Sequence, residues 1–153
     1  MADGFRSRFA TARESPGFLL WRVTHAWQRA VRDTLAEVDL THVQFVLLAS
    51  LAWLGRAGAT VTQVEVARHA GIDRMMTSQV VRVLESRGLL QRPPHPDDRR
   101  ARALALTEAG RARVAEALPR VEAADAAFFA PAGGDLPRLV EVLARLAAAQ
   151  PGE

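Results

Sequence analysis

The fold of this chain is decided by residues 62–110, TQVEVARHAGIDRMMTSQVVRVLESRGLLQRPPHPDDRRARALALTEAG. Thr62 and Glu65 form a capping-box pattern, in which the hydroxyl and the carboxylate each accept a backbone N–H at a helix start. Gly71 ends that helix, and Asp73 is a suitable N-cap for a second one. Apolar residues recur at helical spacing along the second helix and are expected to face the core: Met76, Val80, Val83 and Leu84. Two helices joined by so short a turn predict a helix-turn-helix.

A charged segment broken by prolines follows the second helix. Residues 89–92 can form one strand, residues 93–100 a rigid tip, and residues 101–106 a returning strand. Alternation in the return places four side chains on one face, as in a half-buried strand: Arg100, Arg102, Leu104 and Leu106. The predicted fold class is therefore mainly α with a small β wing, a winged helix-turn-helix, and this architecture indicates a reader of DNA.

Two groups of side chains are candidates for DNA contact. The second helix carries hydroxyls, an amide and guanidiniums that can contact base edges or phosphates: Arg74, Thr77, Ser78, Gln79 and Arg82. Around the wing, the candidates are Asp98, Arg99, Arg100 and Arg102. The alternatives are structural, because polar residues at helical spacing often form only a solvated face. An acidic and a basic residue in a wing can equally form an ion pair that shapes it.

Three runs of residues resemble the MarR family of bacterial transcriptional regulators. They are Met76–Val81, Leu84-Glu85-x-x-Gly88-Leu89, and Asp98-x-Arg100-x-x-x-Leu104-x-Leu106-Thr107-x-x-Gly110. The resemblance covers nearly the whole chain in order and length. It implies a homodimer that places each second helix in a major groove and each wing at a minor groove, and that represses until a small molecule loosens it. It also implies a short strand near Thr60–Val61, and an Asp98 that holds the wing while Arg99, Arg100 or Arg102 reaches DNA.

The flanking sequence predicts helices. Ser15 and Pro16 suit the start of a helix to about residue 37, Thr41 and Gln44 form a second capping box, and residues 45–54 are apolar on all sides. Thr107 can cap a helix to residue 129, in which Pro119 is expected to produce a kink or a break. A turn at 131–134 precedes a last amphipathic helix. We expect a single domain over 1–153, with dimerisation helices in 11–40 and 107–150 and the DNA-binding lobe in 41–106.

Composition narrows the function classes. The chain has 153 residues, 49% of them hydrophobic, so it can bury a core while extended helices leave apolar faces that seek a partner. It contains no cysteine, which excludes a disulfide framework and a thiol redox switch. All 20 basic residues are arginine, and the net charge is +3. The absence of a signal-like start or a long apolar run predicts a cytoplasmic protein without a membrane partner.

An effector pocket and a catalytic or metal site require side chains that converge. Trp21, His25, Phe45 and Trp53 could line a cleft between the first two predicted helices, where the resemblance to the MarR family implies an aromatic anion, although tryptophans at helical spacing more often pack in a core or a dimer interface. The four histidines are too scattered to predict a metal site. No nucleophile elbow or glycine-rich phosphate loop is present, so we expect neither an enzyme nor a cofactor.

Three functions are compared. The first is a homodimeric repressor of a pseudo-palindromic operator, with half-sites about one helical turn apart, released by a small aromatic or anionic ligand. The second is a winged-helix protein-interaction module, which would carry acids or large apolar residues on its recognition face. The third is a small-molecule carrier or enzyme built in the helical part, for which the core offers too few polar groups. The sequence favours the first.

Overall fold

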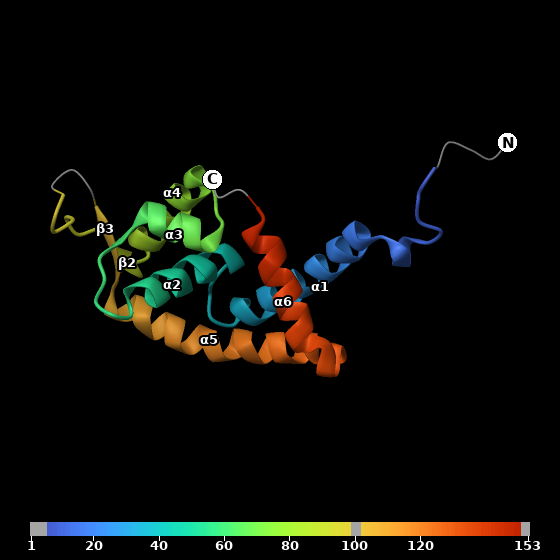
Figure 1. Ribbon diagram of the computed structural model, residues 1–153. Coiled ribbons are helices and arrows are strands. Elements are labelled where there is room, and N and C mark those ends of the chain that lie inside the picture. The colour runs from blue at the N-terminus through green and yellow to red at the C-terminus, as the bar shows by residue number, and fades with distance from the viewer. Residues whose placement is uncertain (1–5, 99–101, 151–153) are drawn as a thin grey trace.

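The computed structural model describes residues 6–98 and 102–150 and places them in a mainly helical fold with a small sheet (Figure 1). The helices and strands follow one another along the chain as η1 (Ala12–Glu14), α1 (Pro16–Ala36), α2 (His42–Gly55), β1 (Val61–Thr62), α3 (Gln63–Ala70), α4 (Arg74–Ser86), β2 (Leu90–Gln91), β3 (Ala103–Leu106), α5 (Glu108–Phe129), η2 (Ala130–Asp135) and α6 (Leu136–Ala148). In Figure 1, α5 runs along one side of the molecule from the wing to α6, and α3 and α4 lie on the opposite side of α2. The predicted fold class is confirmed.

Local hydrogen bonds explain where the helices begin. All five cap residues predicted from the sequence accept a backbone N–H in the first turn: Ser15, Thr41, Thr62, Asp73 and Thr107. The capping boxes of α2 and α3 are complete, because the side chains of Gln44 and Glu65 accept the backbone N–H of the cap. The N–H and hydroxyl of Thr62 both donate to Glu65 and hold the pKa of that carboxyl below its ordinary value.

The core forms around α2, as its uniformly apolar sequence predicts. Leu47, Leu48 and Leu51 of α2 are buried at its centre. The helices and strands packed around them contribute further buried side chains: Val31, Leu35, Val66, Val81, Leu84, Leu104, Val114, Ala117 and Val121. Trp53, near the end of α2, instead lies on the surface.

The sheet has three antiparallel strands in the order β1-β3-β2. Val61 of β1 pairs with Leu104, close to the expected strand at 60–61, and Leu90 of β2 pairs with Leu106. Clean alternation along the return strand was expected but is absent at its start, because Ala103 and Leu104 are both buried. Both faces of β3 are covered at this point, so the alternation expected of a strand with one solvated face does not apply there.

Of the kink or break expected at Pro119, the break is absent, and the kink stays a prediction. α5 continues as one helix through Pro119 to Phe129. A proline removes one N–H from the helix and leaves the carbonyl four residues earlier without its usual donor. Here Pro119 and Ala115 both lie on the exposed side of α5, where water can satisfy that carbonyl.

Apolar surface remains exposed on α1 and α6, near the two ends of the chain. The first half of α1 and α6 enclose an apolar groove of about 410 Å³ that Leu20 and Leu143 help to line. Other large apolar side chains on the same two helices are exposed: Phe18, Leu19, Trp21, Val23, Val140 and Leu146. No helix among the described residues is long and apolar enough to cross a membrane.

Candidate nucleic-acid interface

The helix-turn-helix is set by a tight turn between α3 and α4. Gly71 caps α3 in the left-handed conformation, with φ +64°, which favours glycine. The N–H of Ile72 then donates to the carbonyl of Ala67 at 3.0 Å, and the carboxylate of Asp73 accepts the N–H of Met76 at 2.9 Å. These bonds fix the direction in which α4 leaves α3.

The buried face of α4 is rotated from the one that the sequence predicts. Thr77, Val81 and Leu84 are buried, whereas Met76 and Val83 are 47% and 45% exposed. Thr77 is fully buried, and its hydroxyl donates to the carbonyl of Asp73 at 2.8 Å. The threonine can occupy the core because this bond satisfies its only polar group. The expected DNA contact of Thr77 is therefore corrected: its side chain anchors α4 from inside.

The remaining candidates on α4 lie on its outer face. Arg74, Gln79 and Arg82 are exposed, and Ser78 is half-buried. A guanidinium nitrogen of Arg82 (Nη2) donates to the hydroxyl of Ser78 at 3.1 Å, so the two side chains point along the same stripe. The structure thus brings four of the five candidates together on one open helix surface.

The wing extends beyond the sheet beside α4. Arg102 is exposed where the wing backbone pairs with Pro94, and Asp98 is exposed near the tip. Arg99 and Arg100 lie outside the described residues. An ion pair of 2.7 Å between Arg92 and Glu85 connects the wing to α4. Which wing arginine reaches DNA stays a prediction.

The motif shared by the wing and α5 forms the joint at the base of the wing. The hydroxyl of Thr107 donates to the carbonyl of Gly88 at 2.6 Å, and the N–H of Thr107 donates to the carbonyl of Leu89 at 3.2 Å. Gly110 packs so closely here that a Cβ would lie 1.9 Å from that Leu89 oxygen. Thr107 and Gly110 therefore determine the geometry at the base of the wing and are not candidates for contact with DNA bases.

One arginine at the end of α4 connects it to the turn between α1 and α2. Arg87 donates to the carboxylate of Asp39 at 2.6 Å, to the Asp39 carbonyl at 2.7 Å and to the side chain of Gln44 at 3.0 Å. Asp39 has φ +53°, a left-handed conformation that is uncommon outside glycine. Sequence reasoning missed this contact, because the partners lie more than forty residues apart.

The same turn is also held from α5. Arg120 forms a 2.7 Å ion pair with Glu37, and Arg113 donates to the carbonyl of Val38. Three consecutive residues, Glu37, Val38 and Asp39, are thus each bound by an arginine. We call residues 37–39 with their three arginines the arginine clasp. It joins α1, α5 and α4 at one point of the molecule.

The four residues of the expected effector pocket are not brought together. Phe45 and Trp53 line one cavity of about 510 Å³ between α2 and α5. Trp21 and His25 do not line it; they stack on each other, with ring centroids 3.8 Å apart, on the exposed half of α1. The expectation fails because helical spacing reveals a shared face but not which part of α1 extends past the core.

A different cavity combines an aromatic wall with an arginine and a histidine side chain. It measures about 560 Å³ and lies between α1, the start of α2 and the turn before α4, with Trp27, Arg32, His42 and Ile72 in its lining. The rings of Trp27 and His42 meet edge to face at 5.1 Å, and the indole N–H of Trp27 donates to Asp125 at 2.7 Å. Burial lowers the pKa of His42, the nearby Arg32 lowers it further, and Asp125 opposes the shift.

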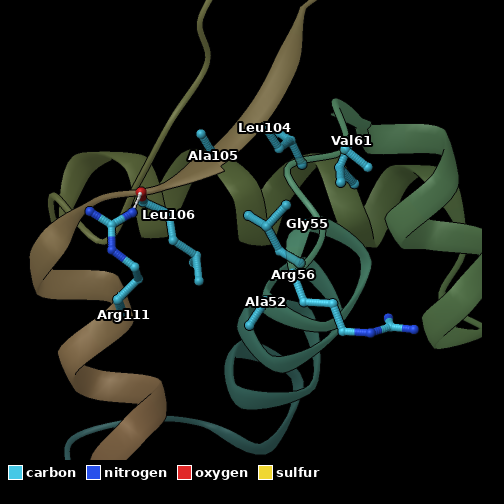
Figure 2. Close-up of a pocket in the computed structure, with 10 residues that line it drawn as sticks. Ala52, Gly55, Arg56, Val61, Leu104, Ala105, Leu106 and Arg111 are labelled. Atoms are coloured by element: carbon cyan, nitrogen blue, oxygen red, sulfur yellow. Dashed lines mark hydrogen bonds between the residues drawn. The ribbon is translucent and has the colours of Figure 1, made fainter.

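Figure 2 shows another cavity, of about 400 Å³, below the wing. Its lining includes the apolar side chains of Leu104, Val61 and Ala52 and the two arginines Arg56 and Arg111. The two guanidiniums do not converge: Arg111 donates to the carbonyl of Leu106 at 2.8 Å, whereas the guanidinium of Arg56 points away from Arg111 (Figure 2). The Arg56 guanidinium lies over the ring of Trp53. Convergent polar groups are what orient a bound ligand, so this cavity is a poorer candidate. Within residues 6–98 and 102–150, no cluster of three or more acidic or histidine side chains could hold a metal.

Comparisons with known proteins agree with this geometry. The model of the MarR family matches residues 40–101, which span α2 to the wing. The HTH-type transcriptional regulator YdcH of Bacillus subtilis (strain 168) is 50% identical over 128 residues, 84% of this chain and 87% of that protein.

Solved structures extend the likeness to whole chains. The transcriptional repressor CouR of Rhodococcus jostii RHA1, bound to a 23-mer DNA duplex, is 30% identical with a TM-score of 0.80, covering 94% of this chain and 99% of CouR. BpsR of Bordetella bronchiseptica is 28% identical with a TM-score of 0.81, covering 94% of this chain and 100% of BpsR. A relative that is half identical over most of both chains, with a family match that spans the helix-turn-helix and wing, shows that this chain belongs to the MarR family of transcriptional regulators.

Proposed function

We propose that this protein is a homodimeric repressor that binds a pseudo-palindromic operator in the bacterial cytoplasm. Its α4 would enter the major groove and its wing the adjacent minor groove. The observation that carries the proposal is the open stripe of Arg74, Ser78, Gln79 and Arg82 on α4, in a chain whose fold follows that of a DNA-bound repressor from end to end. An exposed row of hydroxyl, amide and guanidinium groups matches the donors and acceptors of base edges.

The uncovered apolar surface supports the homodimer. Residues 11–40 and 107–150, proposed to dimerise, contain the exposed apolar side chains of α1 and α6. An exposed patch of this kind is typical of an interface. Two-fold symmetry then places two copies of α4 on one side of the dimer, about one helical turn apart on DNA. Residues 41–106 form the proposed DNA-binding lobe.

The cavity beside Trp27 is our candidate for the effector site. CouR has been solved with p-coumaroyl-CoA, and BpsR is described as regulated by 6-hydroxynicotinic acid, so aromatic ligands occur among similar proteins. In this chain, Arg32 and a protonated His42 could hold an anionic group while Trp27 contacts an aromatic ring. Because Ala70 at the end of α3 and Ile72 in the turn before α4 also line the cavity, a bound ligand would displace α4 relative to α1.

The first experiment titrates the purified protein with its own upstream DNA at two salt concentrations, using fluorescence anisotropy and a scrambled duplex as control. The proposal expects saturable, salt-sensitive binding that strongly prefers the native duplex. Equal, weak binding to both duplexes would contradict the proposal if DNA selected from a random pool also binds no more tightly than the scrambled duplex. The protein-interaction module would then become the better hypothesis.

Two arginine variants separate base reading from phosphate contact. If Arg82 reads a base, Arg82→Ala should relax the preference at one operator position by about 1–3 kcal/mol. Arg102→Ala should weaken binding evenly on all sequences and lower the slope of log K against log salt by about one. Arg100→Ala is expected to behave like Arg102→Ala. A uniform loss for Arg82→Ala would make Arg82 a phosphate contact, and an unchanged salt slope for Arg102→Ala would make Arg102 structural.

A further inference from the structure

One large apolar side chain lies in the middle of the polar stripe of α4. Met75 is 74% exposed, the highest exposed fraction among the large apolar side chains in the described part of the chain. It is the second residue of α4, directly after Arg74. Sequence reasoning passed over it because the apolar pattern assigned to the core began one residue later, at Met76.

The position of Met75 relates it to the groups proposed to contact DNA. Residues three, four and seven positions apart lie on one face of a helix, so Met75 shares its face with Ser78, Gln79 and Arg82. The opposite face, with Thr77, Val81 and Leu84, is the one that is buried. Met75 therefore points in the same direction as Ser78, Gln79 and Arg82, and packing within residues 6–98 and 102–150 leaves its side chain mostly exposed.

We propose that Met75 is a specificity-determining residue that contacts the C5-methyl group of a thymine in each half-site. This inference rests on the proposed function, because it requires α4 to enter the major groove. The thymine methyl is the one apolar group that base pairs present there. The first residues of a recognition helix are the ones that reach base edges. A methionine side chain is long and adaptable enough to cover a methyl group without a fixed pocket.

The chain offers a matched control one residue further along. Met76 is the same side chain in the same helical turn, but it is 47% exposed and lies on the flank of α4 that carries Val80 and Val83. Met76→Ala therefore removes the same side-chain atoms at a neighbouring position of α4 without removing the proposed contact.

The test replaces thymine by uracil, which deletes only the methyl group. An operator is first selected from random duplexes with the wild-type protein, and each thymine is then exchanged singly for deoxyuridine. We expect one position per half-site at which the exchange weakens wild-type binding about three- to fivefold, the effect of losing one buried methyl group. Met75→Ala should bind the thymine operator about as weakly as wild type binds the uracil form, and should not distinguish the two. Met76→Ala should still distinguish them.

The outcomes separate this inference from the proposed function. If the protein selects an operator, yet no uracil exchange weakens binding or Met75→Ala still distinguishes thymine from uracil, the assignment of Met75 is wrong and the repressor proposal stands. If the protein prefers no duplex over a scrambled one, both the assignment of Met75 and the proposed repressor function are wrong. Circular dichroism and thermal melting of Met75→Ala should match wild type, because the side chain contacts solvent and its removal leaves no cavity in the fold.

Discussion

Two glycines show how the same substitution can have opposite effects at two places in this chain. Gly110, in the first turn of α5, would place a Cβ 1.9 Å from the backbone oxygen of Leu89. A backbone atom cannot move aside as a flexible side chain can, so Gly110→Ala must separate α5 from the base of the wing. We expect it to lower the free energy of unfolding by about 1–3 kcal/mol and to weaken DNA binding through the displaced wing.

Gly17 is the control for that prediction. It lies in the first turn of α1, and a Cβ there would meet no heavy atom within 4 Å. Gly17→Ala should therefore be neutral or stabilise the protein by up to about 1 kcal/mol, because alanine favours the helix. Denaturant unfolding of both variants measures the difference. Equal stability of the two variants would mean that the backbones at Gly110 and Leu89 can move apart without a loss of stability.

His42 should make the stability of the protein depend on pH. Burial and the neighbouring Arg32 lower its pKa in the folded state from the ordinary value of 6.5, and Asp125 acts against them. The unfolded chain then binds a proton more readily than the folded one, so stability is full above pH 6.5 and falls as the pH drops from there through the lowered pKa.

The measurement is denaturant unfolding of wild type and His42→Gln between pH 7.5 and 5. We expect the wild type to lose stability relative to the variant as the pH falls, since glutamine carries no titrating group. Parallel curves would place the folded pKa of His42 at its unfolded value. A bound anion should reduce the wild-type loss, because it favours the protonated imidazole.

At the scale of helices and strands, the arginine clasp is the contact through which α4 is oriented. Arg87 makes two charge-assisted hydrogen bonds to Asp39 in the turn after α1 and a third to Gln44 in the first turn of α2, and its side chain is 27% exposed. Arg87→Ala should lower the free energy of unfolding by about 1–3 kcal/mol, because hydrogen bonds to a charged group contribute more than exposed ion pairs do. It should also weaken operator binding although Arg87 touches no base in the proposed complex.

Arg92→Ala is the comparison for Arg87→Ala. Arg92 forms a single ion pair of 2.7 Å with Glu85, and both side chains are more than a third exposed. Its loss should cost at most about 1 kcal/mol. Asp39→Gly provides a second comparison, since it keeps the carbonyl bonded by Arg87 and suits the left-handed backbone at this position. If all three variants unfold alike, the clasp does not hold α4.

How well the sequence predicts a feature depends on how far apart in the chain the contacting residues lie. The starts of the helices were predictable, because a cap such as Thr62 with Glu65 uses bonds within four residues. The buried face of α4 was predicted with the wrong phase, because Thr77 enters the core only by bonding to its own helix, which a hydropathy pattern does not register. The cavity beside Trp27 and the arginine clasp depend on distant segments, so the order of the residues alone did not reveal them.

At the scale of the whole molecule, a single copy of the chain leaves large apolar side chains of α1 and α6 exposed to solvent. Leu20 of α1 is 55% exposed and Val140 of α6 is 56% exposed. The two helices that carry them lie on the side of the molecule away from the wing (Figure 1). Burying each side chain against a partner would contribute about 1.5–3 kcal/mol. A charge at either position would have to be desolvated in that interface without an opposing charge.

We therefore expect Leu20→Glu and Val140→Glu to shift the protein toward monomer in sedimentation velocity and to abolish tight binding of the full operator. Binding of a single half-site should persist at its weaker level, because α4 and the wing remain folded in each monomer. Trp53→Gln is the matched control: Trp53 is 57% exposed, yet it lies on α2, outside residues 11–40 and 107–150, which are proposed to dimerise. If the two glutamate variants stay dimeric while the control dissociates, the interface lies on α2, and the distance between the two recognition helices must be derived again from that surface.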